Sequence, residues 1–533
     1  MASSSSSNDM EQQMRSEENT SEGFDYISHL PEAIMLYILS FLPIKDLMVV
    51  SLLSRLWKSM VVNHLSIVPS SLKLDEFESI KNYIRQSARH HQCAEFHVLF
   101  SSPVYLKHLH DVGRRQYQDY VDRTLMLHTG CTINKLQLIL CYDGSDGYTR
   151  RITRWVRFAF TNKIKKLIVD FSRGQQVHPD NVVEPYDLSV TNFSPVNLQS
   201  LTLTYCKLTA SSFGILWSVK RLCLKMVTII ECSISDLVSK CPVLEDLSME
   251  HCVFPNEFMV SKTVIKIKRL SLIHCTTEDR PMFSIEMSAS ELLELEIVAN
   301  YLMVSSIQNA VNLLDVEIDV DQDYADHIQG DALSSFLNGL DHCKTLTLTT
   351  WCIQLLPIGE NLLNQLPKPL QRLEHLKLVL GFGRQELPGI ACLLRSCPNL
   401  KILTITMKEE EVDVDWTEFL DDIPDLLNFD EDTYWESQLL PFDCLEKTLK
   451  QVNISGFSTK LNEVKMVTFL LEGAKLLENM VIFCAETSMI SSNPTEKHVQ
   501  DLWYQDNSHF VHSLPKVAVE ARVAVFRNLR CDL

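Results

Sequence analysis

Long apolar runs are missing from this 533-residue chain, and the longest unbroken one is the seven-residue segment Ala33–Leu39. A membrane-spanning helix needs about 20 apolar residues, so none is expected. The first 23 residues contain only one Ala and three Met as apolar types, so no signal-peptide core is expected either. Glycine is scarce, at 15 residues, and no phosphate-binding glycine loop, zinc-protease or serine-hydrolase motif occurs. We therefore expect no membrane association, no cofactor and no enzymatic activity.

Paired cysteines of the Cys-x2-Cys type are also absent, although the chain has 16 cysteines. His-Cys pairs at 251–252, 274–275 and 342–343 suggest metal ligands, but zinc sites usually use paired cysteines. The alternative is that these cysteines are structural. In a chain without a signal peptide, thiols are expected to stay reduced rather than to form disulfides.

A basic excess is missing as well. Of the net charge of −19, residues 1–23 carry −4 and residues 409–436 carry −13, which leaves −2 for the rest of the chain. A nucleic-acid-binding protein needs a basic surface to neutralise phosphates, so no nucleic-acid partner is expected. The acidic start, with serine at every position from Ser3 to Ser7, predicts a disordered tail.

One apolar pattern recurs along most of the chain: an apolar residue, two variable residues, an apolar residue, a variable residue and an apolar residue. Its central positions are 21 to 34 residues apart. They are Leu136, Leu167, Leu201, Leu222, Leu247, Leu270, Leu295, Val316, Leu346, Leu376 and Leu403. Alternating apolar residues predict short strands. A repeat of this length predicts a solenoid, in which stacked units share one continuous core.

Small polar residues often stand five residues after the central position. They are Cys141, Cys206, Cys252, Cys275 and Asn300. Such side chains can hydrogen-bond the loop backbone between coils, and in this feature the sequence resembles the leucine-rich-repeat family in an irregular form. The likeness makes the cysteines of the His-Cys pairs repeat positions. Pro242 and Pro398 each predict the end of a helix on the opposite side of a coil.

A helical pattern precedes the repeats. Pro31 suits the first turn of a helix, and apolar residues at 34, 35, 38, 39 and 42 form one face. Pro43 ends this helix, and Asp46 can cap a second one that runs through Met60 and is apolar on more than one side. Two short helices cannot bury so much apolar surface between themselves, so the repeats or another protein must cover it.

The segment from Tyr26 to Leu65 closely resembles an F-box in residue order and spacing. The matching residues are Leu30-Pro31, Ile34, Ile38-Leu39, Leu42-Pro43, Asp46-Leu47, Ser51, Ser54-Arg55 and Trp57. F-box proteins dock on a Skp-type adaptor, which links them to cullin and RING subunits of a ubiquitin ligase, so the resemblance implies these partners. It also implies which residues make or support the adaptor contact: Leu30, Pro31, Ile34, Leu39, Leu42 and Trp57. The alternative is a helical cap on the first repeat.

Residues 409–436 interrupt the repeats with thirteen acidic residues and no basic ones. Aromatic residues stand among them at Trp416, Phe419, Tyr434 and Trp435. Two interpretations stay open. The segment is either a solvated insertion, or a surface that contacts a basic segment of a bound target with its aromatic residues as anchors.

The apolar spacing resumes around Val452 and Met480, with a helical pattern at 467, 470, 471, 474 and 477 between them. Two further coils are therefore predicted. From Trp435 to Phe483 the sequence also resembles the FBD domain of plant F-box proteins, with Gly473 where that pattern usually has Asn. Near the C-terminus, alternating apolar residues from Val517 to Phe526 predict a last strand.

Together the patterns predict an α/β chain with an N-terminal F-box helical hairpin, an irregular leucine-rich-repeat solenoid and a closing FBD block. The predicted segments are a disordered tail at 1–23, the F-box at 24–65, repeats at 90–408, an acidic insertion at 409–434, the FBD at 435–485 and a C-terminal segment at 486–533. In this order the chain resembles the plant F-box/FBD/leucine-rich-repeat family.

That resemblance implies a substrate-recognition subunit of an SCF-type ubiquitin ligase, acting in the nucleus and/or cytoplasm. It would bind an unknown target protein and position it for ubiquitin transfer, so no residue of this chain needs to do covalent chemistry. The alternative is a repeat-based binding scaffold that has no adaptor.

Overall fold

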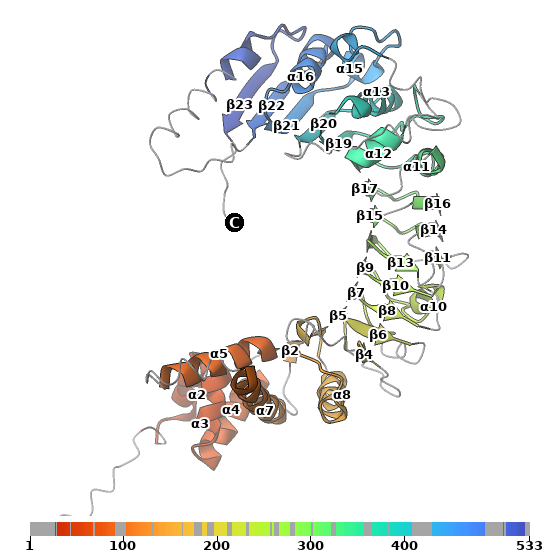
Figure 1. The fold of residues 1–533 in the computed structure, drawn as a ribbon. Helices are drawn as coiled ribbons and strands as arrows, with labels where there is room; N and C mark the ends of the chain where they lie inside the picture. Colours follow the sequence, from red (N-terminus) through yellow and green to blue (C-terminus); the bar gives the residue numbers. More distant parts are fainter. Residues whose placement is uncertain are drawn as a thin grey trace, which may run out of the picture. The chain divides into compact units, whose positions relative to one another are not determined.

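The computed structural model describes residues 27–67, 70–90, 103–128, 133–174, 184–188, 197–209, 216–230, 234–255, 258–260, 266–277, 283–299, 302–320, 327–356, 364–407, 429–485 and 505–527, apart from residues 28, 43, 163, 382, 506 and 507. The predicted tail at 1–23 lies outside these residues. The chain divides into two compact units (Figure 1). The first comprises residues 1–139 and 150–167, and the second comprises residues 140–149 and 168–533.

The first unit begins with three helices, α2 (Glu32–Ser40), α3 (Ile44–Ser51) and α4 (Arg55–Ile67). The prediction of one long second helix was wrong. The chain turns at residues 52–54, and the Ser54 hydroxyl accepts a 3.2 Å hydrogen bond from the Trp57 amide, which starts α4. Pro31 is the N-cap of α2 rather than its first residue. Asp46 lies inside the first turn of α3, where a carboxylate favours the helix dipole, instead of capping the helix.

The first unit then continues with β1 (Ser70–Asp75), α5 (Glu76–His90), α7 (Pro103–Leu127), β2 (Ile133–Ile139) and most of α8 (Asp146–Thr161). Of these, β2 contains the predicted repeat position Leu136, and the other four elements were not predicted. β1 pairs in parallel with β2, and Leu72 and Leu74 lie opposite Leu136 and Leu138. Strand pairing of the repeat type therefore starts at β1, ahead of the predicted boundary at residue 90.

A long parallel sheet dominates the second unit, and its twelve described strands follow one another in chain order. They are β5 (Ser200–Thr204), β7 (Arg221–Lys225), β9 (Asp246–Glu250), β12 (Arg269–Ile273), β15 (Glu294–Ala299), β17 (Asp315–Val320), β18 (Thr345–Thr349), β19 (His375–Leu380), β20 (Ile402–Met407), β21 (Gln451–Phe457), β22 (Asn479–Cys484) and β23 (Arg522–Arg527). A further strand, β3 (Lys166–Asp170), crosses the boundary between the units.

The strand register confirms the predicted repeat. Each central apolar residue lies opposite the next one, from Leu201 and Leu222 on β5 and β7 to Leu403 on β20. The row continues through Val452 and Met480 on β21 and β22, so the block after the acidic segment extends the same sheet. All of these residues are buried. One face of every strand thus contributes to a shared apolar core.

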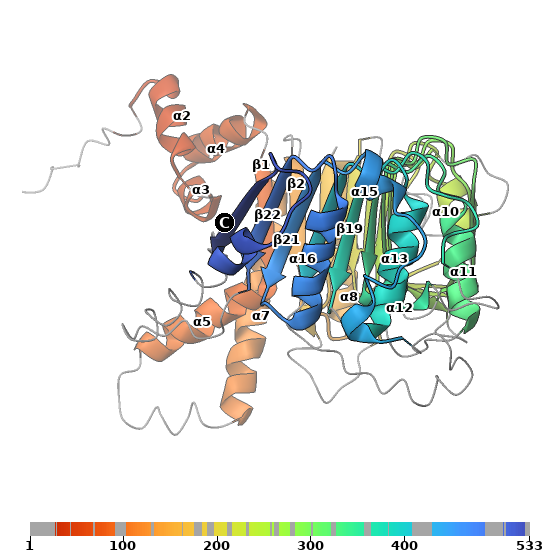
Figure 2. The same ribbon diagram turned by 90° about the horizontal axis from the view of Figure 1, so that it is seen from above.

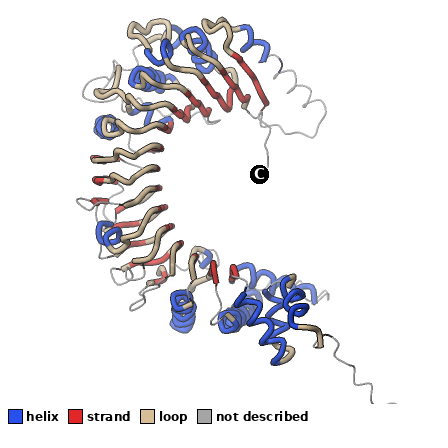
Figure 3. Tube along the Cα trace, turned by 180° about the vertical axis from the view of Figure 1, so that it is seen from behind, coloured by secondary structure: helices blue, strands red, loops and turns tan. Residues whose placement is uncertain are grey.

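On the side of each repeat that lies away from the long sheet, the secondary structure changes from short strands to helices along the second unit. Early coils carry short strands in two smaller parallel sheets: β4 (Tyr186–Asp187), β6 (Cys206–Leu208), β8 (Thr228–Ile229), β10 (Val253–Phe254) and β13 (Thr276–Thr277), and then β11 (Phe258–Val260), β14 (Phe283–Ser288) and β16 (Leu302–Gln308). Later coils carry helices instead: α11 (His327–Leu337), α12 (Thr350–Leu355), α13 (Leu387–Ser396), α15 (Asp443–Lys447) and α16 (Leu461–Gly473). Figure 2 shows α13, α15 and α16 on one face of the long sheet, and Figure 3 shows the stacked strands from behind.

Two helix ends agree with the sequence. α13 ends directly before the pair Cys397-Pro398, and α10 (Ile234–Ser239) ends one residue before the pair Cys241-Pro242. Since proline removes a backbone donor and disfavours helix in the residue before it, neither helix can continue.

The predicted backbone contacts of the ladder are seen at two of its positions, Cys252 and Cys275. The Cys252 thiol lies 3.4 Å from the Leu224 carbonyl oxygen, and the Cys275 thiol lies 3.5 Å from the Met249 carbonyl oxygen, each in the preceding coil. Cys343 is buried before β18 and donates to the Thr345 carbonyl oxygen at 2.9 Å. Burial raises the pKa of the Cys343 thiol to about 12, so it stays a protonated donor. Asn300 lies outside the described residues.

The block after the acidic segment differs in detail from the prediction. Ala474 and Leu477 belong to the chain after α16, which ends at Gly473. A Cβ atom on Gly473 would lie 2.9 Å from Cδ1 of Leu445, so glycine here lets α16 approach α15 closely. The last strand, β23, begins at Arg522 rather than at residue 517.

The acidic segment is described only from residue 429, so Trp416 and Phe419 lie outside the described residues. Tyr434 and Trp435 are buried, and the Trp435 ring stacks on Phe469 with centroids 4.4 Å apart. The idea that these two aromatic residues anchor a bound target is therefore wrong, because they anchor the segment to the chain's own core.

Candidate partner-binding surfaces

The F-box helices have a small core of their own. It consists of Met35, Leu39, Leu47, Trp57, Met60 and Val61. Leu39 and Val61 are completely buried, and the half-buried side chains of Leu30 and Leu42 pack against the cluster. The domain therefore closes without using every apolar side chain that it carries.

One surface of α2 is apolar and open. Ile34, Tyr37, Ile38 and Phe41 follow the i, i+3, i+4, i+7 spacing of a single helix face, and their exposed fractions range from 39% to 69%. The rings of Tyr37 and Phe41 meet edge to face with centroids 4.9 Å apart. We call these four residues the α2 patch. Four large apolar residues so exposed on less than three helical turns are typical of a protein-interaction surface.

A second apolar surface surrounds the turn between α3 and α4. Val49, Leu52 and Leu53 are 61%, 73% and 67% exposed, and Leu56 at the start of α4 is 39% exposed. We call these four residues the α3–α4 patch. In the residues that the structure describes, neither patch is covered by a neighbouring element to the extent that the core residues are.

The predicted adaptor-contact residues divide into two groups. Pro31 and Ile34 are exposed and can touch a partner directly. Leu39 and Trp57 are buried, so they can only support the contact by holding the helices together. Leu30 and Leu42 are intermediate in exposure, and each packs against the core.

Of the eight patch residues, only Ile34 was predicted to contact the adaptor. The other seven are Tyr37, Ile38, Phe41, Val49, Leu52, Leu53 and Leu56. The spacing of Tyr37 and Phe41 relative to Ile34 was visible in the sequence, since it is the same helical period. What the sequence did not show is which of two apolar faces is the core. That choice depends on how α2 packs against α4, which only the structure shows.

The exposed face of the long sheet in the second unit offers another surface. Carboxylates gather on two adjacent strands, at Glu294 and Glu296 on β15 and at Asp315, Glu317 and Asp319 on β17. A hollow of about 520 Å³ lies here and is also lined by Arg269 and Lys377. Desolvation in this hollow raises the pKa of Glu317, and the neighbouring Glu296 carboxylate raises it further. The face is therefore polar and mostly acidic at its middle.

Comparison with known proteins identifies both regions. The F-box domain family matches residues 27–67, and the family described as At1g61320/AtMIF1, LRR domain, matches residues 124–503, more than half of the chain. The chain belongs to the plant F-box/leucine-rich-repeat family.

Similar proteins of this F-box/leucine-rich-repeat family come from Arabidopsis thaliana. The putative F-box/LRR-repeat protein At5g54820 is 24% identical over 90% of this chain and 98% of its own length. The putative F-box protein At3g29830 is 25% identical over 84% of this chain and 88% of its own. The putative F-box/FBD/LRR-repeat protein At4g03220 is 23% identical over 86% of this chain and 89% of its own.

Membership of the family gives the chain a general role. An F-box implies binding to a Skp-type adaptor, and a leucine-rich-repeat domain implies binding of other proteins. This is thus an F-box protein with a protein-interaction role. Among the described residues, no helix is long and apolar enough to cross a membrane, and no group of three or more His, Cys, Asp or Glu is arranged to hold a metal ion.

Proposed function

We propose that this protein is the substrate-recognition subunit of an SCF-type ubiquitin ligase. The observation that carries the proposal is the exposure of the α2 and α3–α4 patches on a domain that already has a closed core. Leaving eight large apolar side chains in water costs free energy, at roughly 25 cal/mol for each Å² of apolar surface. A Skp-type adaptor seated on these patches would remove that surface from water, and through it the chain would join cullin and RING subunits.

The repeats then serve as the target-binding part. We propose that they form a leucine-rich-repeat solenoid closed by an FBD block, and that a target protein docks on the exposed face of the long sheet. Its variable positions stand in register from strand to strand, as in Ser271, Glu296 and Glu317 on β12, β15 and β17, which supports a continuous docking surface.

The mechanism is proximity. Members of the F-box/leucine-rich-repeat family are typically non-enzymatic adaptors, and we propose no covalent step for this chain. It would hold a target lysine near a charged ubiquitin-conjugating enzyme and so raise its effective concentration. We propose that it acts in the nucleus and/or cytoplasm, where thiols stay reduced. The thiols of Cys252 and Cys275, which lie near backbone carbonyl oxygens, are consistent with this.

Co-purification from plant cells tests this proposal. Tagged full-length protein should bring down a Skp-type adaptor, a cullin and a RING subunit. The double variant Ile34→Glu/Phe41→Glu should lose all three, because it places two charges on the α2 patch without touching the core. Leu439→Glu is the matched control, since Leu439 is 97% exposed in the second unit and lies far along the chain from the F-box.

The alternative, a repeat scaffold without ligase association, makes the opposite prediction. A folded wild-type chain that captures no adaptor or cullin would contradict the ligase proposal and favour the scaffold. Equal capture by wild type and the Ile34/Phe41 variant would contradict the assignment of the α2 patch.

A further inference from the structure

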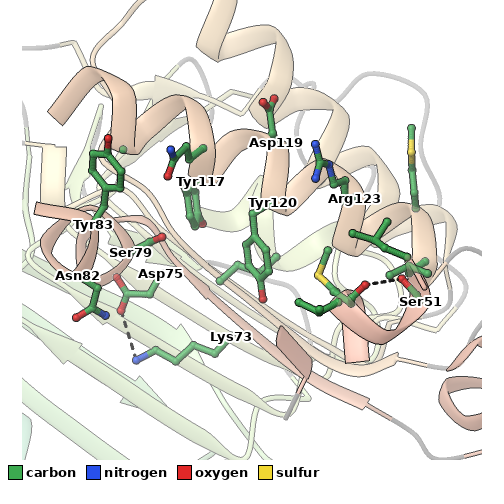
Figure 4. A pocket seen from close by; sticks show the side chains of 18 of the residues that line it. Ser51, Lys73, Asp75, Ser79, Asn82, Tyr83, Tyr117, Asp119, Tyr120 and Arg123 are labelled. Atoms are coloured by element: carbon green, nitrogen blue, oxygen red, sulfur yellow. Dashed lines mark hydrogen bonds and ion pairs between the residues drawn. The ribbon is translucent and has the colours of Figure 1, made fainter. Parts of the chain in front are cut away.

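A cavity of about 770 Å³ lies in the first unit, and Val49 and Leu52 of the α3–α4 patch form part of its rim. Its walls come from three places: the F-box helices α3 and α4, strand β1 with helix α5, and helix α7. Figure 4 shows Tyr117 and Tyr120 of α7 pointing toward the side where Lys73 and Asp75 of β1 lie. Pockets of about 300–1,000 Å³ are the size that encloses drug-sized molecules.

The floor of the cavity is apolar and aromatic. Leu74, Tyr117 and Met48 are each less than 10% exposed, so the floor belongs to the folded core rather than to the outer surface. Further apolar lining comes from Leu52, Val62, Tyr83, Tyr120, Met126 and Leu127. Tyrosine and methionine side chains adapt to ligand shape and contact aromatic or alicyclic rings well. Burial in this site raises the pKa of Tyr120.

One end of the cavity is polar. Lys73 and Asp75 at the end of β1 form an ion pair of 3.4 Å, and Ser79 and Asn82 on α5 lie beside them (Figure 4). At the other end, the Ser51 hydroxyl donates a 2.6 Å hydrogen bond to the Met48 carbonyl oxygen, and Lys58 of α4 stands among apolar side chains of the F-box. Neutral hydrogen-bonding groups therefore gather on α5, whereas the F-box contributes apolar side chains together with the Lys58 ammonium.

Positive and negative side chains line the cavity in equal number. Its cations are Lys58, Lys73 and Arg123, and its anions are Asp75, Glu78 and Asp119. A strongly charged ligand would gain little from such a lining and would lose its hydration. A neutral ligand with a hydroxyl, carbonyl or amide group at one end matches the charge balance and the hydrogen-bonding side chains of Ser79 and Asn82.

We propose that this cavity binds a small uncharged amphipathic molecule. Its aromatic or alicyclic body would lie against Tyr117, Tyr120 and Met48, and its hydrogen-bonding group would face Lys73 and Asn82. Because Met48 belongs to α3 and Leu52 to the turn that follows it, a bound molecule would contact the F-box directly. The proposal does not depend on the ligase assignment.

The test uses Nile red, an uncharged planar fluorescent dye with one carbonyl group, titrated into the full-length protein. The expected result is saturable binding of one dye per chain. Ser79→Trp should fill the polar end and weaken binding at least tenfold. Lys81→Trp is the matched control, because Lys81 is exposed on the same helix and does not line the cavity. Circular-dichroism melting shows whether each variant folds.

A second blocking variant, Gln116→Trp on α7, keeps the test decisive if Ser79→Trp does not fold, since Gln116 is exposed at the cavity rim. No saturable dye binding by the folded wild type would overturn the proposal. Binding that is unchanged in the folded blocking variants would also overturn it, and would assign the dye to the exposed F-box patches.

A dye titration in the presence of a saturating concentration of Skp-type adaptor tests whether the adaptor itself occupies the cavity. Retained dye binding in the adaptor complex supports a small-molecule site. Displacement of the dye would overturn the proposal and assign the cavity to the adaptor interface. If no adaptor complex forms, the titration of the free chain still decides the proposal, so its failure and that of the ligase assignment are distinguishable.

Discussion

Neighbouring residues of α2 have opposite roles, which a pair of alanine substitutions can separate. Leu39 is completely buried in the F-box core, whereas Phe41, two residues later, is 69% exposed. Leu39→Ala should lower the free energy of unfolding of the first unit by about 2–5 kcal/mol, because it removes buried methyl groups and leaves a cavity. Phe41→Ala should change it by less than about 0.5 kcal/mol.

Urea unfolding followed by circular dichroism measures both substitutions. A large destabilisation by Phe41→Ala would contradict the account, because it would mean that the α2 patch is already covered within the chain.

The buried side chain of His128 should make the stability of the first unit depend on pH. Its side chain is fully buried at the end of α7, and its Nδ1 lies 2.8 Å from the Thr124 carbonyl oxygen. Burial lowers the pKa of His128 below its usual 6.5, and the hydrogen bond to Thr124 offsets only part of that. The native imidazole therefore stays neutral while the unfolded chain takes up a proton. Its contribution to stability is fully present above about pH 6.5 and is lost as the pH falls toward the lower native pKa.

His128→Asn should reduce this loss, since asparagine can donate to the same carbonyl but cannot be protonated. The measurement is the urea midpoint at pH 7.5 and pH 5.5. Wild type should lose more stability between the two pH values than His128→Asn does. An equal loss in both proteins would show that His128 is not the titrating group.

Two helical glycines differ in how closely a neighbouring helix approaches them. A Cβ atom on Gly389 of α13 would lie 1.8 Å from the Ile353 carbonyl oxygen of α12, whereas a Cβ atom on Gly147 of α8 would meet nothing within 4 Å. Gly389→Ala should therefore destabilise the second unit by more than about 1–3 kcal/mol through overpacking. Gly147→Ala should be neutral or stabilise by up to about 1 kcal/mol through helix propensity.

Thermal melting of the two variants checks this pair, with Gly147→Ala as the control for the mutation type. A Gly389→Ala protein as stable as wild type would show that α12 and α13 are further apart than described.

Elements with strict periodicity could be predicted from the sequence. Leu270 and Leu295 each stand in a short alternating run, and the same run recurs often enough to fix the strand register. The break between α3 and α4 could not be predicted, because apolar residues continue through Leu52 and Leu53 and only the Ser54 cap marks it. The burial of Trp435 was missed for a related reason, since an acidic neighbourhood says nothing about a distant partner such as Phe469.

At the scale of the whole molecule, each unit presents a surface that its own core does not require. On the sheet face of the second unit this surface is acidic, and its carboxylates lower the free energy of unfolding when they are ionised. The raised pKa of Glu317 means that its ionised form is disfavoured in the native state at neutral pH. Glu317→Gln should therefore raise stability at pH 7, by no more than about 0.5 kcal/mol because the group is exposed and screened.

The gain from Glu317→Gln should shrink as the pH falls through the native pKa and vanish below about 4.5, where folded and unfolded chains are both protonated. Melting temperatures at pH 7 and pH 4 measure it. Glu472→Gln is the control for a simple loss of charge, because Glu472 is an exposed residue of α16. A loss of stability in Glu317→Gln at pH 7 would contradict the described crowding of carboxylates.

The central claim is that the F-box patches bind a Skp-type adaptor, and direct binding of purified proteins tests it most simply. Light scattering should show a one-to-one complex of full-length protein and adaptor, and calorimetry should give its affinity. Ile34→Glu/Phe41→Glu should weaken binding at least about 100-fold, since apolar anchors at the centre of an interface each contribute about 2 kcal/mol or more. Leu439→Glu should bind like wild type. A folded wild-type protein that forms no complex would contradict the account.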